Sequence, residues 1–416
     1  MALEHSSRMC NAKAVKKKKT TYSIDKGSKS RQVHEPPGTY HARRRKVADN
    51  TLLPGLDTVE TTVPQSGLTY SIEAAFRRYG LEGEDVFLAI AARCVQESHL
   101  RHSGFKFFKY ERGLQVLNLV IHDSQVKSLL ARVCIGSDAV GQLPVWYQYF
   151  VGRRFREGSG KFFTPAPVAR SMASLLPLDA GMTICDPTCG GGTFLSEVAQ
   201  LLHDTKCELV GNDVDLTLVG LTEVVLYLTC SDIQKRHLFC DNVYDRGPFV
   251  ETYSERVDCI LANPPFSLPL ESVGMQSALF RMGYRNSDAV FLDVCLELLK
   301  EGGHLICLLP HSIVVNTDYL ELRSHVEQNW DLCGIITLPE GIFYMTASTT
   351  TRADIIHLRK KVAGRPSQDR VYFANAPTAG VALNSRDATP SDNALDEVVL
   401  STRAKGCLVG LAEGSK

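Results

Sequence analysis

The sequence predicts an α/β protein with a doubly wound sheet, preceded by a small helical domain. After residue 160, short apolar runs rich in β-branched residues alternate with amphipathic stretches, which is typical of a parallel sheet covered by helices. Before residue 152, apolar residues recur at spacings of three and four, as they do on a helix. Polar and glycine-rich motifs directly follow several expected strands, where ligands bind in folds of this kind.

The first 66 residues are expected to form a basic, disordered leader. Residues 1–50 hold 13 Lys or Arg against 4 Asp or Glu, although the formal net charge of the chain is zero. Blocks of like charge with little apolar content do not fold by themselves. Such a leader fits a solvated tail, and it equally fits a nucleic-acid tether or a nuclear-type address.

Composition narrows the class of protein. No apolar run approaches 18 residues and no secretory signal is visible, so we expect no membrane association and a location in the cytoplasm, with the nucleoid or, in a eukaryote, the nucleus as the site of action. The 13 cysteines include no CxxC pair and no Cys/His cluster at zinc spacing. Neither a disulfide framework nor a metal site is therefore expected.

We expect a helical domain at 67–152, a catalytic domain at 153–360 and a C-terminal extension at 361–416. The helical domain contains "SIEAAFRRYG", "EDVFLAIAARCVQESHL" and "SQVKSLLARVCI". The extension contains one short helix at "DNALDEVVLS". In the catalytic domain, "TFLSEVAQLLHD" is expected to be a helix that places Phe194, Val198, Leu201 and Leu202 on one face. The expected strands are "MTICDPT", "CELVGNDV", "RHLFCDNV", "RVDCILANPP", "GHLICLLP", "CGIITLPE" and "ADIIHLRK".

A glycine-rich loop, "ICDPTCGGGTFL" (184–195), follows the first expected strand. Glycines let a ligand approach the main chain. Thr193 and Phe194 stand where a Walker phosphate loop needs Lys and Ser or Thr, and Asp186 precedes the glycines, where its charge would repel a pyrophosphate. A carboxylate there suits the sulfonium and amino group of S-adenosylmethionine, which we therefore expect as cofactor.

Two further acids end the next two strands. Asp213, in "LVGNDVD", lies 21 residues beyond Gly192, the spacing at which an acid commonly accepts hydrogen bonds from ribose hydroxyls. Asp241, in "LFCDNV", can accept from the adenine amino group of the cofactor. Either acid alone could be a helix N-cap or a loop carboxylate, but three acids at three successive strand ends favour cofactor binding.

The stretch "ILANPPFSLP" (260–269) ends the fourth strand with Asn263, Pro264, Pro265 and Phe266. An amine on an aromatic ring is a weak nucleophile, and two acceptors, one for each N–H, can localise its lone pair. Asn263 offers its side-chain oxygen and Pro264 its backbone carbonyl, while the prolines stiffen the turn and remove competing donors. Phe266 offers a flat face to an extruded base, a contact worth ~1–3 kcal/mol. The motif predicts methylation of an amine, without specifying whose.

Five stretches resemble, in order, the modification subunit of type I restriction-modification systems, a family of DNA adenine methyltransferases. They are "GKFFTPAPVARSMASLL", "DPTCGGGTFLSEV", "LANPPFS", "LLKEGGHLICLLP" and "TLPEGIFYMTAS". The resemblance covers about 147–360 and extends weakly to near 400. It implies the class I S-adenosylmethionine-dependent methyltransferase fold, methyl transfer to the N6 amine of adenine in DNA, and a separate specificity subunit, with a second copy of the chain as a further partner.

The resemblance also implies roles for individual residues. Those that match cofactor-binding positions are Phe162, Thr164, Pro165, Asp186, Pro187, Gly190, Gly192, Phe194, Asp213 and Asp241. Asn263, Pro264, Pro265 and Phe266 match the catalytic tetrapeptide. Phe343, in "EGIFY", falls where an aromatic residue can form the second wall of the base pocket, and a core Phe fits the same position. No metal is implied.

The chain departs from the family pattern in three places. Phe163 stands where Tyr is usual, Thr193 replaces a frequent Gly, and Met345-Thr346 replaces Gly-Thr. No segment outside the core is long enough to read a bipartite site in the major groove. Two alternatives stay open: the same chemistry on an RNA base amine or a protein glutamine, and a non-catalytic nucleic-acid-binding relative.

Overall fold

The structure is a computed structural model that describes residues 66–98, 107, 109–133, 140–151, 163–344, 351–367, 370–383 and 392–404. The basic leader up to residue 65, Phe162 and the Met345-Thr346 pair lie outside the described residues. Among the helices of the described part, none combines the length and the hydropathy that a membrane span requires.

The first five helices of the described part of the chain share one apolar cluster. They are α1 (Ser66–Arg77), α2 (Glu84–Gln96), α3 (Tyr110–Val120), α4 (Ser124–Leu130) and α5 (Leu143–Phe150). The three stretches predicted to be helical are α1, α2 and α4. Asp123 begins α4 by accepting hydrogen bonds from the backbone N–H groups of Gln125 and Val126, as an N-cap does. Ile72, Phe87 and Trp146 are buried in the cluster.

Eight described strands form one sheet in the order β3-β2-β1-β4-β5-β7-β6-β8. All seven predicted strands are present, as β1 (Thr183–Asp186), β2 (Glu208–Asn212), β3 (Lys235–Phe239), β4 (Val257–Ala262), β5 (Leu299–Pro310), β6 (Trp330–Thr337) and β7 (Ala353–Lys360). The eighth, β8 (Tyr372–Asn375), was not predicted. It is only four residues long and lies at the edge of the sheet.

The sheet is mixed, and the expectation of a parallel sheet is wrong at β7. Strands β3, β2, β1, β4 and β5 are parallel, whereas β7 runs antiparallel to both β5 and β6. Because β6 and β7 are consecutive and antiparallel, no crossover helix is needed between them. The sequence could not show this, since the first six residues of β7 are all buried and read like a central parallel strand.

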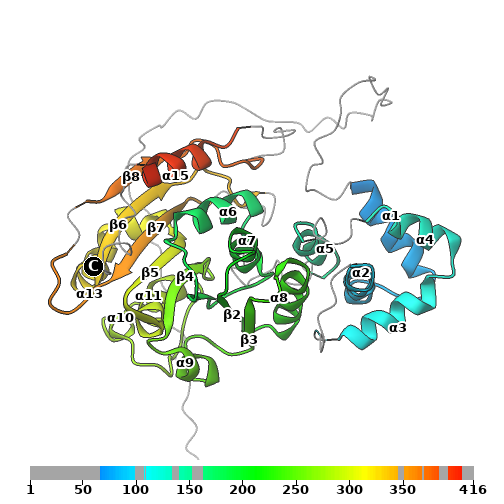
Figure 1. Ribbon diagram of the computed structural model, residues 1–416, viewed down its shortest axis with the longest axis horizontal. Coiled ribbons are helices and arrows are strands. Elements are labelled where there is room, and N and C mark those ends of the chain that lie inside the picture. Colours follow the sequence, from blue (N-terminus) through cyan, green and yellow to red (C-terminus); the bar gives the residue numbers. More distant parts are fainter. Residues whose placement is uncertain are drawn as a thin grey trace, which may run out of the picture. The chain divides into compact units, whose positions relative to one another are not determined.

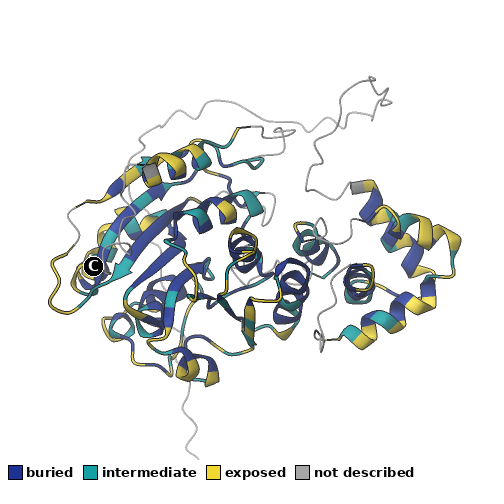
Figure 2. Cartoon of the chain, in the orientation of Figure 1, coloured by how far each residue is buried: buried dark blue, intermediate teal, exposed yellow. Residues whose placement is uncertain are grey.

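Helices cover both faces of the sheet (Figure 1). One apolar cluster joins one face to α6 (Ala166–Leu175), α7 (Thr193–Leu201) and α15 (Ala394–Ala404). Another joins the opposite face to α9 (Pro248–Tyr253), α11 (Ser287–Leu298) and α13 (Leu320–Asn329). The shorter helices α10 (Ala278–Arg281), α12 (His311–Val315) and η3 (Thr317–Tyr319) lie between these elements along the chain. Figure 2 shows the central strands buried between the two helical layers.

The prediction for α7 is wrong at one residue. Phe194, Val198 and Leu202 are buried, but Leu201, the last residue of the helix, is 47% exposed. Helix α8 (Leu216–Thr229) differs from α7 in that nearly all of its residues are buried. Leu226 joins the sheet cluster, while Leu221 and Val225 join the cluster of the N-terminal helices.

The sheet continues beyond residue 360, where the sequence suggested an extension. Strand β8 pairs with β6 in parallel register, and α15, which was expected from "DNALDEVVLS", packs against α6. Asp396 of α15 accepts a hydrogen bond from Ser171 of α6, and Arg403 donates to the carbonyl of Ser174 at 3.0 Å. These contacts attach the last described helix to the domain that holds the expected site.

Candidate active site

A pocket of about 320 Å³ opens at the carboxyl ends of β1, β2, β3 and β4, within the usual range of roughly 300–1,000 Å³ for small-ligand sites. Four strands that end at one edge bring together side chains that are far apart in the sequence. Nine of the predicted residues line this pocket: Thr164, Asp186, Pro187, Gly190, Phe194, Asp213, Asp241, Asn263 and Pro265.

The glycine loop between β1 and α7 depends on backbone conformations that favour glycine. Gly190 has a φ of 51° and Gly192 a φ of 77°, and both lie in the left-handed region. A Cβ on Gly192 would also meet Thr222 at 3.0 Å. The Gly190 N–H donates to Asp213 Oδ2 at 3.0 Å. The loop is thus bent around the end of β2 and begins α7 directly at the pocket.

Asp186 is a buried carboxyl group at the tip of β1. It is 1% exposed, and its Oδ1 accepts a hydrogen bond from Thr188 N at 3.1 Å. Burial raises the pKa of Asp186 well above its usual value, and the nearby charge of Asp213 raises it further. A cation bound in the pocket would stabilise both carboxylates. Two carboxyl groups placed in this way fit the sulfonium and ammonium groups of S-adenosylmethionine.

Asp213 and Asp241 lie at the ends of β2 and β3, and both already hold backbone groups. Asp213 Oδ1 accepts from Asp215 N at 2.9 Å, in addition to the bond from Gly190. Asp241 Oδ2 accepts from Phe249 N at 2.8 Å, at the start of α9. The helix-capping alternative therefore holds for one oxygen of Asp241. Each carboxylate oxygen can accept more than one bond, so these contacts leave room for ligand hydroxyl or amino groups.

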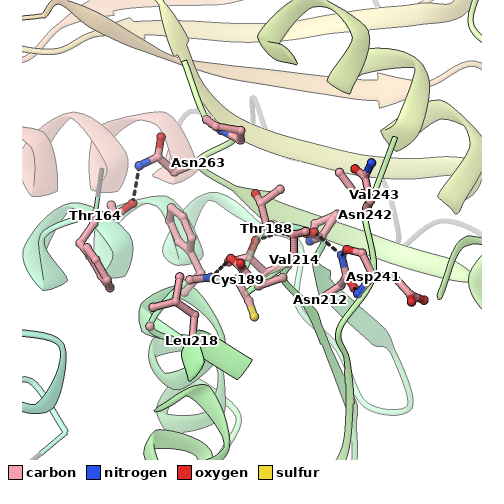
Figure 3. A pocket seen from close by; sticks show the side chains of 18 of the residues that line it. Thr164, Thr188, Cys189, Asn212, Val214, Leu218, Asp241, Asn242, Val243 and Asn263 are labelled. Carbon is pink, nitrogen blue, oxygen red and sulfur yellow. Dashed lines mark hydrogen bonds between the residues drawn. The ribbon is translucent and has the colours of Figure 1, made fainter. Parts of the chain in front are cut away.

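Asn212 connects the three strand ends, and the sequence did not point to it. Its Nδ2 donates to the carbonyls of Pro187 and Asp241, both at 3.0 Å, and its Oδ1 accepts from Asp241 N at 2.9 Å. Figure 3 shows its side chain next to Asp241. The side chain is 1% exposed. An amide as the last residue of a buried strand is the only signal in the sequence that could have identified it.

Asn263 follows β4 directly, and its amide group faces the pocket. Its Nδ2 donates to the hydroxyl of Thr164 at 3.1 Å, as Figure 3 shows. Thr164, which begins the segment before α6, is 8% exposed. Because the Thr164 hydroxyl takes the nitrogen side of the amide, the orientation of the Asn263 oxygen is set by this bond.

Phe266 and Phe343 contact each other in the core beside the pocket. Their ring centroids are 5.8 Å apart and their planes are inclined by 83°. Phe266 is 7% exposed and Phe343 is fully buried. In this conformation the two rings meet edge to face, so they do not form two parallel walls around a base, and the core alternative describes Phe343 better.

Pro165, Gly192 and Pro264 were also predicted but are not among the residues that line the pocket. Pro165 precedes α6 as its N-cap residue, Gly192 precedes α7 in the same position, and Pro264 is a buried residue of the turn after β4. Phe162 lies outside the described residues.

Three potential metal ligands gather in the β5-β7-β6 part of the sheet, although the sequence spacing showed no such group. His304, Cys333 and His357 are buried and place their ligand atoms within 4.8 Å of one another. They come from β5, β6 and β7, so only the folded sheet brings them together. His304 Nδ1 lies 2.9 Å from His357 Nε2, and His357 Nδ1 lies 3.0 Å from the Tyr372 hydroxyl. This hydrogen-bonded chain accounts for both imidazoles.

Comparisons with known proteins agree with this architecture. The family model of the N-6 DNA Methylase matches residues 137–402. The chain is 25% identical over 242 residues to the type I restriction enzyme EcoEI methylase subunit of Escherichia coli, covering 55% of this chain and 47% of that protein. It is 26% identical over 186 residues to the type II methyltransferase M.VspI of a Vibrio species, covering 43% of each. The chain thus spans less than half the length of these curated relatives.

Two solved structures share the fold. A protein of Listeria monocytogenes assigned to the class I S-adenosylmethionine-dependent methyltransferases matches with a TM-score of 0.53 and 18% identity, over 80% of this chain and 96% of that one. The type I restriction-modification methyltransferase subunit of Streptococcus thermophilus matches with a TM-score of 0.52 and 21% identity, over 73% of this chain and 64% of that one.

The strand order, the glycine loop and the acids at the strand ends define a class I S-adenosylmethionine-dependent methyltransferase fold. Within that class, the chain belongs to the N-6 DNA methylase family. The family and the fold imply S-adenosylmethionine as the cofactor, in agreement with the expectation drawn from Asp186 and the glycines.

Proposed function

We propose that this chain transfers a methyl group to the exocyclic N6 amine of adenine in DNA, together with a separate specificity subunit. The observation that carries the proposal is the position of Asn263, Pro264, Pro265 and Phe266. They follow β4 directly, and Asn263 and Pro265 line the same pocket as the glycine loop and Asp186. The side chain proposed to accept a hydrogen bond from the substrate amine and the loop proposed to hold the cofactor therefore line one cavity.

Bound S-adenosylmethionine would supply a methyl group on a positively charged sulfur. Asp186, Asp213 and Asp241 would hold the cofactor, the first near its charged end and the other two near its ribose and adenine. Asn263 would accept one N–H of the target amine with its side-chain oxygen, and Pro264 would accept the other with its carbonyl. Fixed acceptors of this kind act without reorganisation when charge develops on the nitrogen.

The target base must leave the duplex to reach Asn263. Extrusion costs a few kcal/mol, which contacts between DNA and a partner protein could offset. Several relatives of the chain are named as methylase subunits of type I restriction enzymes, which supports a partner of this kind. In the helical cluster that precedes the sheet, Lys109 and Arg112 are paired with Glu84 and Asp85.

The test is methyl transfer from labelled S-adenosylmethionine to DNA that lacks N6-methyladenine, followed by digestion and nucleoside analysis. We expect N6-methyl-2′-deoxyadenosine as the product, at a low rate for the chain alone and at a higher rate when its specificity subunit is added. Asn263→Ala should abolish the product while calorimetry still detects cofactor binding. An unchanged rate in this variant would remove Asn263 from the mechanism.

A second candidate keeps the chemistry and changes the acceptor. The chain is 28% identical over 181 residues to a tRNA (guanine(10)-N2)-dimethyltransferase of Methanothermobacter thermautotrophicus, covering 41% of this chain and 45% of that protein. The same digestion applied to RNA would reveal an N2-methylated guanosine. Label in RNA or in a protein glutamine, with none in DNA, would reject the adenine proposal in favour of this one.

A further inference from the structure

The first two residues of α11 contact the corner that contains Asn263. The Ser287 hydroxyl donates to the carbonyl of Pro265 and accepts from Leu268 N at 3.1 Å. Ser287 N also donates to the carbonyl of Leu268 at 2.8 Å. Asp288 Oδ2 accepts from Ser267 N at 3.3 Å, and its Oδ1 from Ala289 N at 3.1 Å. Both side chains are essentially inaccessible to water.

Ser267, the residue after Phe266, has a conformation that needs support. Its φ is 54°, in the left-handed region that residues with a Cβ rarely adopt. Such a conformation persists only where the surrounding structure enforces it. The bonds from Ser267 N to Asp288 and from Leu268 N to Ser287 fix the two peptide groups that follow Phe266. The chain is thereby turned back toward α11 immediately after the corner.

We propose that Asp288, together with Ser287, is a positioning residue that holds the Asn263–Phe266 corner in the shape that grips a planar amine. This rests on the proposed function, since it assigns Asn263 and Pro264 the role of acceptors. The prolines stiffen the corner and have no N–H of their own. The corner therefore depends on the carbonyl of Pro265 and on the N–H groups of Ser267 and Leu268 for its anchorage, and α11 engages all three.

The geometric requirement is strict at this point. A displacement of about 1 Å at a catalytic group can lower a rate by about a hundredfold. Thr164 orients the end of the Asn263 amide through the side chain. Helix α11 supplies a second constraint, and it is anchored in the core by Val290, Phe291 and Val294.

The experiment compares Asp288→Asn with Asp293→Asn in the full chain. Asn in place of Asp288 keeps the shape but turns one acceptor oxygen into a donor, so either Ser267 N or Ala289 N loses its partner. Asp293 is the matched control, because it lies on the same helix, is similarly buried, and holds a different segment. It accepts from Ser277 Oγ at 2.6 Å and from Leu279 N at 2.9 Å, and it contacts His325 at 2.8 Å.

Four measurements follow: kcat at saturating cofactor, the Kd for S-adenosylmethionine by calorimetry, amide hydrogen exchange over residues 264–270, and the midpoint of thermal unfolding. For Asp288→Asn we expect a loss in kcat of about tenfold to a hundredfold, an unchanged Kd, faster exchange in that segment and a lower unfolding midpoint. For Asp293→Asn we expect a similar decrease of the unfolding midpoint, with kcat and exchange over 264–270 as in the wild type. Equal effects of the two variants, or no effect of Asp288→Asn on exchange, would overturn the proposal.

A rescue variant separates positioning from general destabilisation. Glycine adopts the left-handed conformation readily, so Ser267→Gly added to Asp288→Asn should restore part of kcat. A double variant no better than Asp288→Asn would count against the role of the strained turn. If the wild type methylates no acceptor, the proposed function fails, and hydrogen exchange alone still decides whether Asp288 holds the corner.

Discussion

The Thr164 hydroxyl and the Asn263 amide meet at 3.1 Å, although 99 residues separate them in the sequence. The sequence assigned Thr164 to the cofactor and Asn263 to the substrate amine. The bond fixes which end of the Asn263 amide is held by Thr164, and both residues line the same pocket. Under the proposed function, Thr164 would therefore orient the Asn263 oxygen toward the substrate amine.

Thr164→Val should lower kcat by about tenfold to a hundredfold at saturating cofactor, because the amide of Asn263 loses the acceptor that orients it. Valine keeps the size and branching of threonine, so packing is preserved. Thr164→Ser retains the hydroxyl and serves as the control, with kcat close to that of the wild type. Steady-state methyl transfer at several cofactor concentrations makes the comparison. Equal rates for the Val and Ser variants would show that the hydroxyl does not orient Asn263.

Among single residues, the sequence located those whose position follows from strand ends. Asp186, Asp213 and Asp241 end adjacent parallel strands, so their convergence on one edge could be predicted. Asn212 and Asp288 could not be found in this way. Their contacts run to backbone groups of other loops, and the geometry of those loops is known only once the chain is folded.

At the scale of elements, a chain of buried side chains links β5, β7 and β8 through His304, His357 and Tyr372. Burial lowers the pKa of His304 to about 4, with a contribution from the charge of Arg359. Burial also lowers the pKa of His357 well below its usual value, and His304 and Arg359 lower it further. Both imidazoles are therefore neutral in the folded protein at neutral pH.

The hydrogen-bonded His304, His357 and Tyr372 should make the free energy of unfolding depend on pH in a defined window. An unfolded histidine has a pKa of about 6.5, so the unfolded state takes up protons first as the pH falls from about 6.5 towards 4. The stabilisation of the folded state by the two neutral histidines is complete above about pH 6.5 and is lost as the pH falls through this window. The raised pKa values of Asp186 and Asp288 act in the opposite direction, so the informative quantity is the difference between variants.

His357→Gln should lower the unfolding midpoint at pH 7.5 and should reduce its decline between pH 7 and pH 5, because the group that resists protonation is gone. Thermal unfolding followed by circular dichroism at several pH values measures both effects. His203→Gln is the control, since His203 is an exposed residue after α7, and its curve should run parallel to that of the wild type. A decline in His357→Gln as steep as in the wild type would show that His357 does not contribute to the pH dependence of stability.

The direction of β7 shows what periodicity cannot supply at this scale. Buried strands with apolar residues on both faces look alike in a sequence whether they run parallel or antiparallel, so seven strands were predicted correctly while the sheet was taken to be parallel. Strand β8 was missed because it is four residues long and pairs on one side only. The resemblance to type I modification subunits does not depend on strand direction, because it rests on the order of five motifs along the chain.

At the scale of the whole molecule, α8 joins the N-terminal helices to the cofactor site. Its Leu221 and Val225 share an apolar cluster with Phe87 and Trp146, while its Thr222 hydroxyl donates to the carbonyl of Gly190 at 2.8 Å. Unlike a helix on the surface of a domain, α8 has no face made of exposed residues, because nearly all of its residues are buried. The helical cluster therefore protects a helix that also shapes the glycine loop.

Deletion of residues 1–151 should therefore cause aggregation or weaken cofactor binding, whereas deletion of residues 1–65 should leave both properties unchanged. The larger deletion removes Tyr147, whose ring lies 6.1 Å from that of Phe163, and Phe163 is the residue that a Cβ on Gly191 would meet at 2.9 Å. It also exposes several apolar side chains of α8, each worth ~1.5–3 kcal/mol when buried. Solubility on size-exclusion chromatography and calorimetry with S-adenosylmethionine test the two effects.

To separate aggregation from weaker cofactor binding, Leu221 and Val225 can be replaced with Gln in the shorter chain, which should restore solubility but not affinity. Wild-type affinity in that soluble variant would show that the cofactor site is independent of the helical cluster.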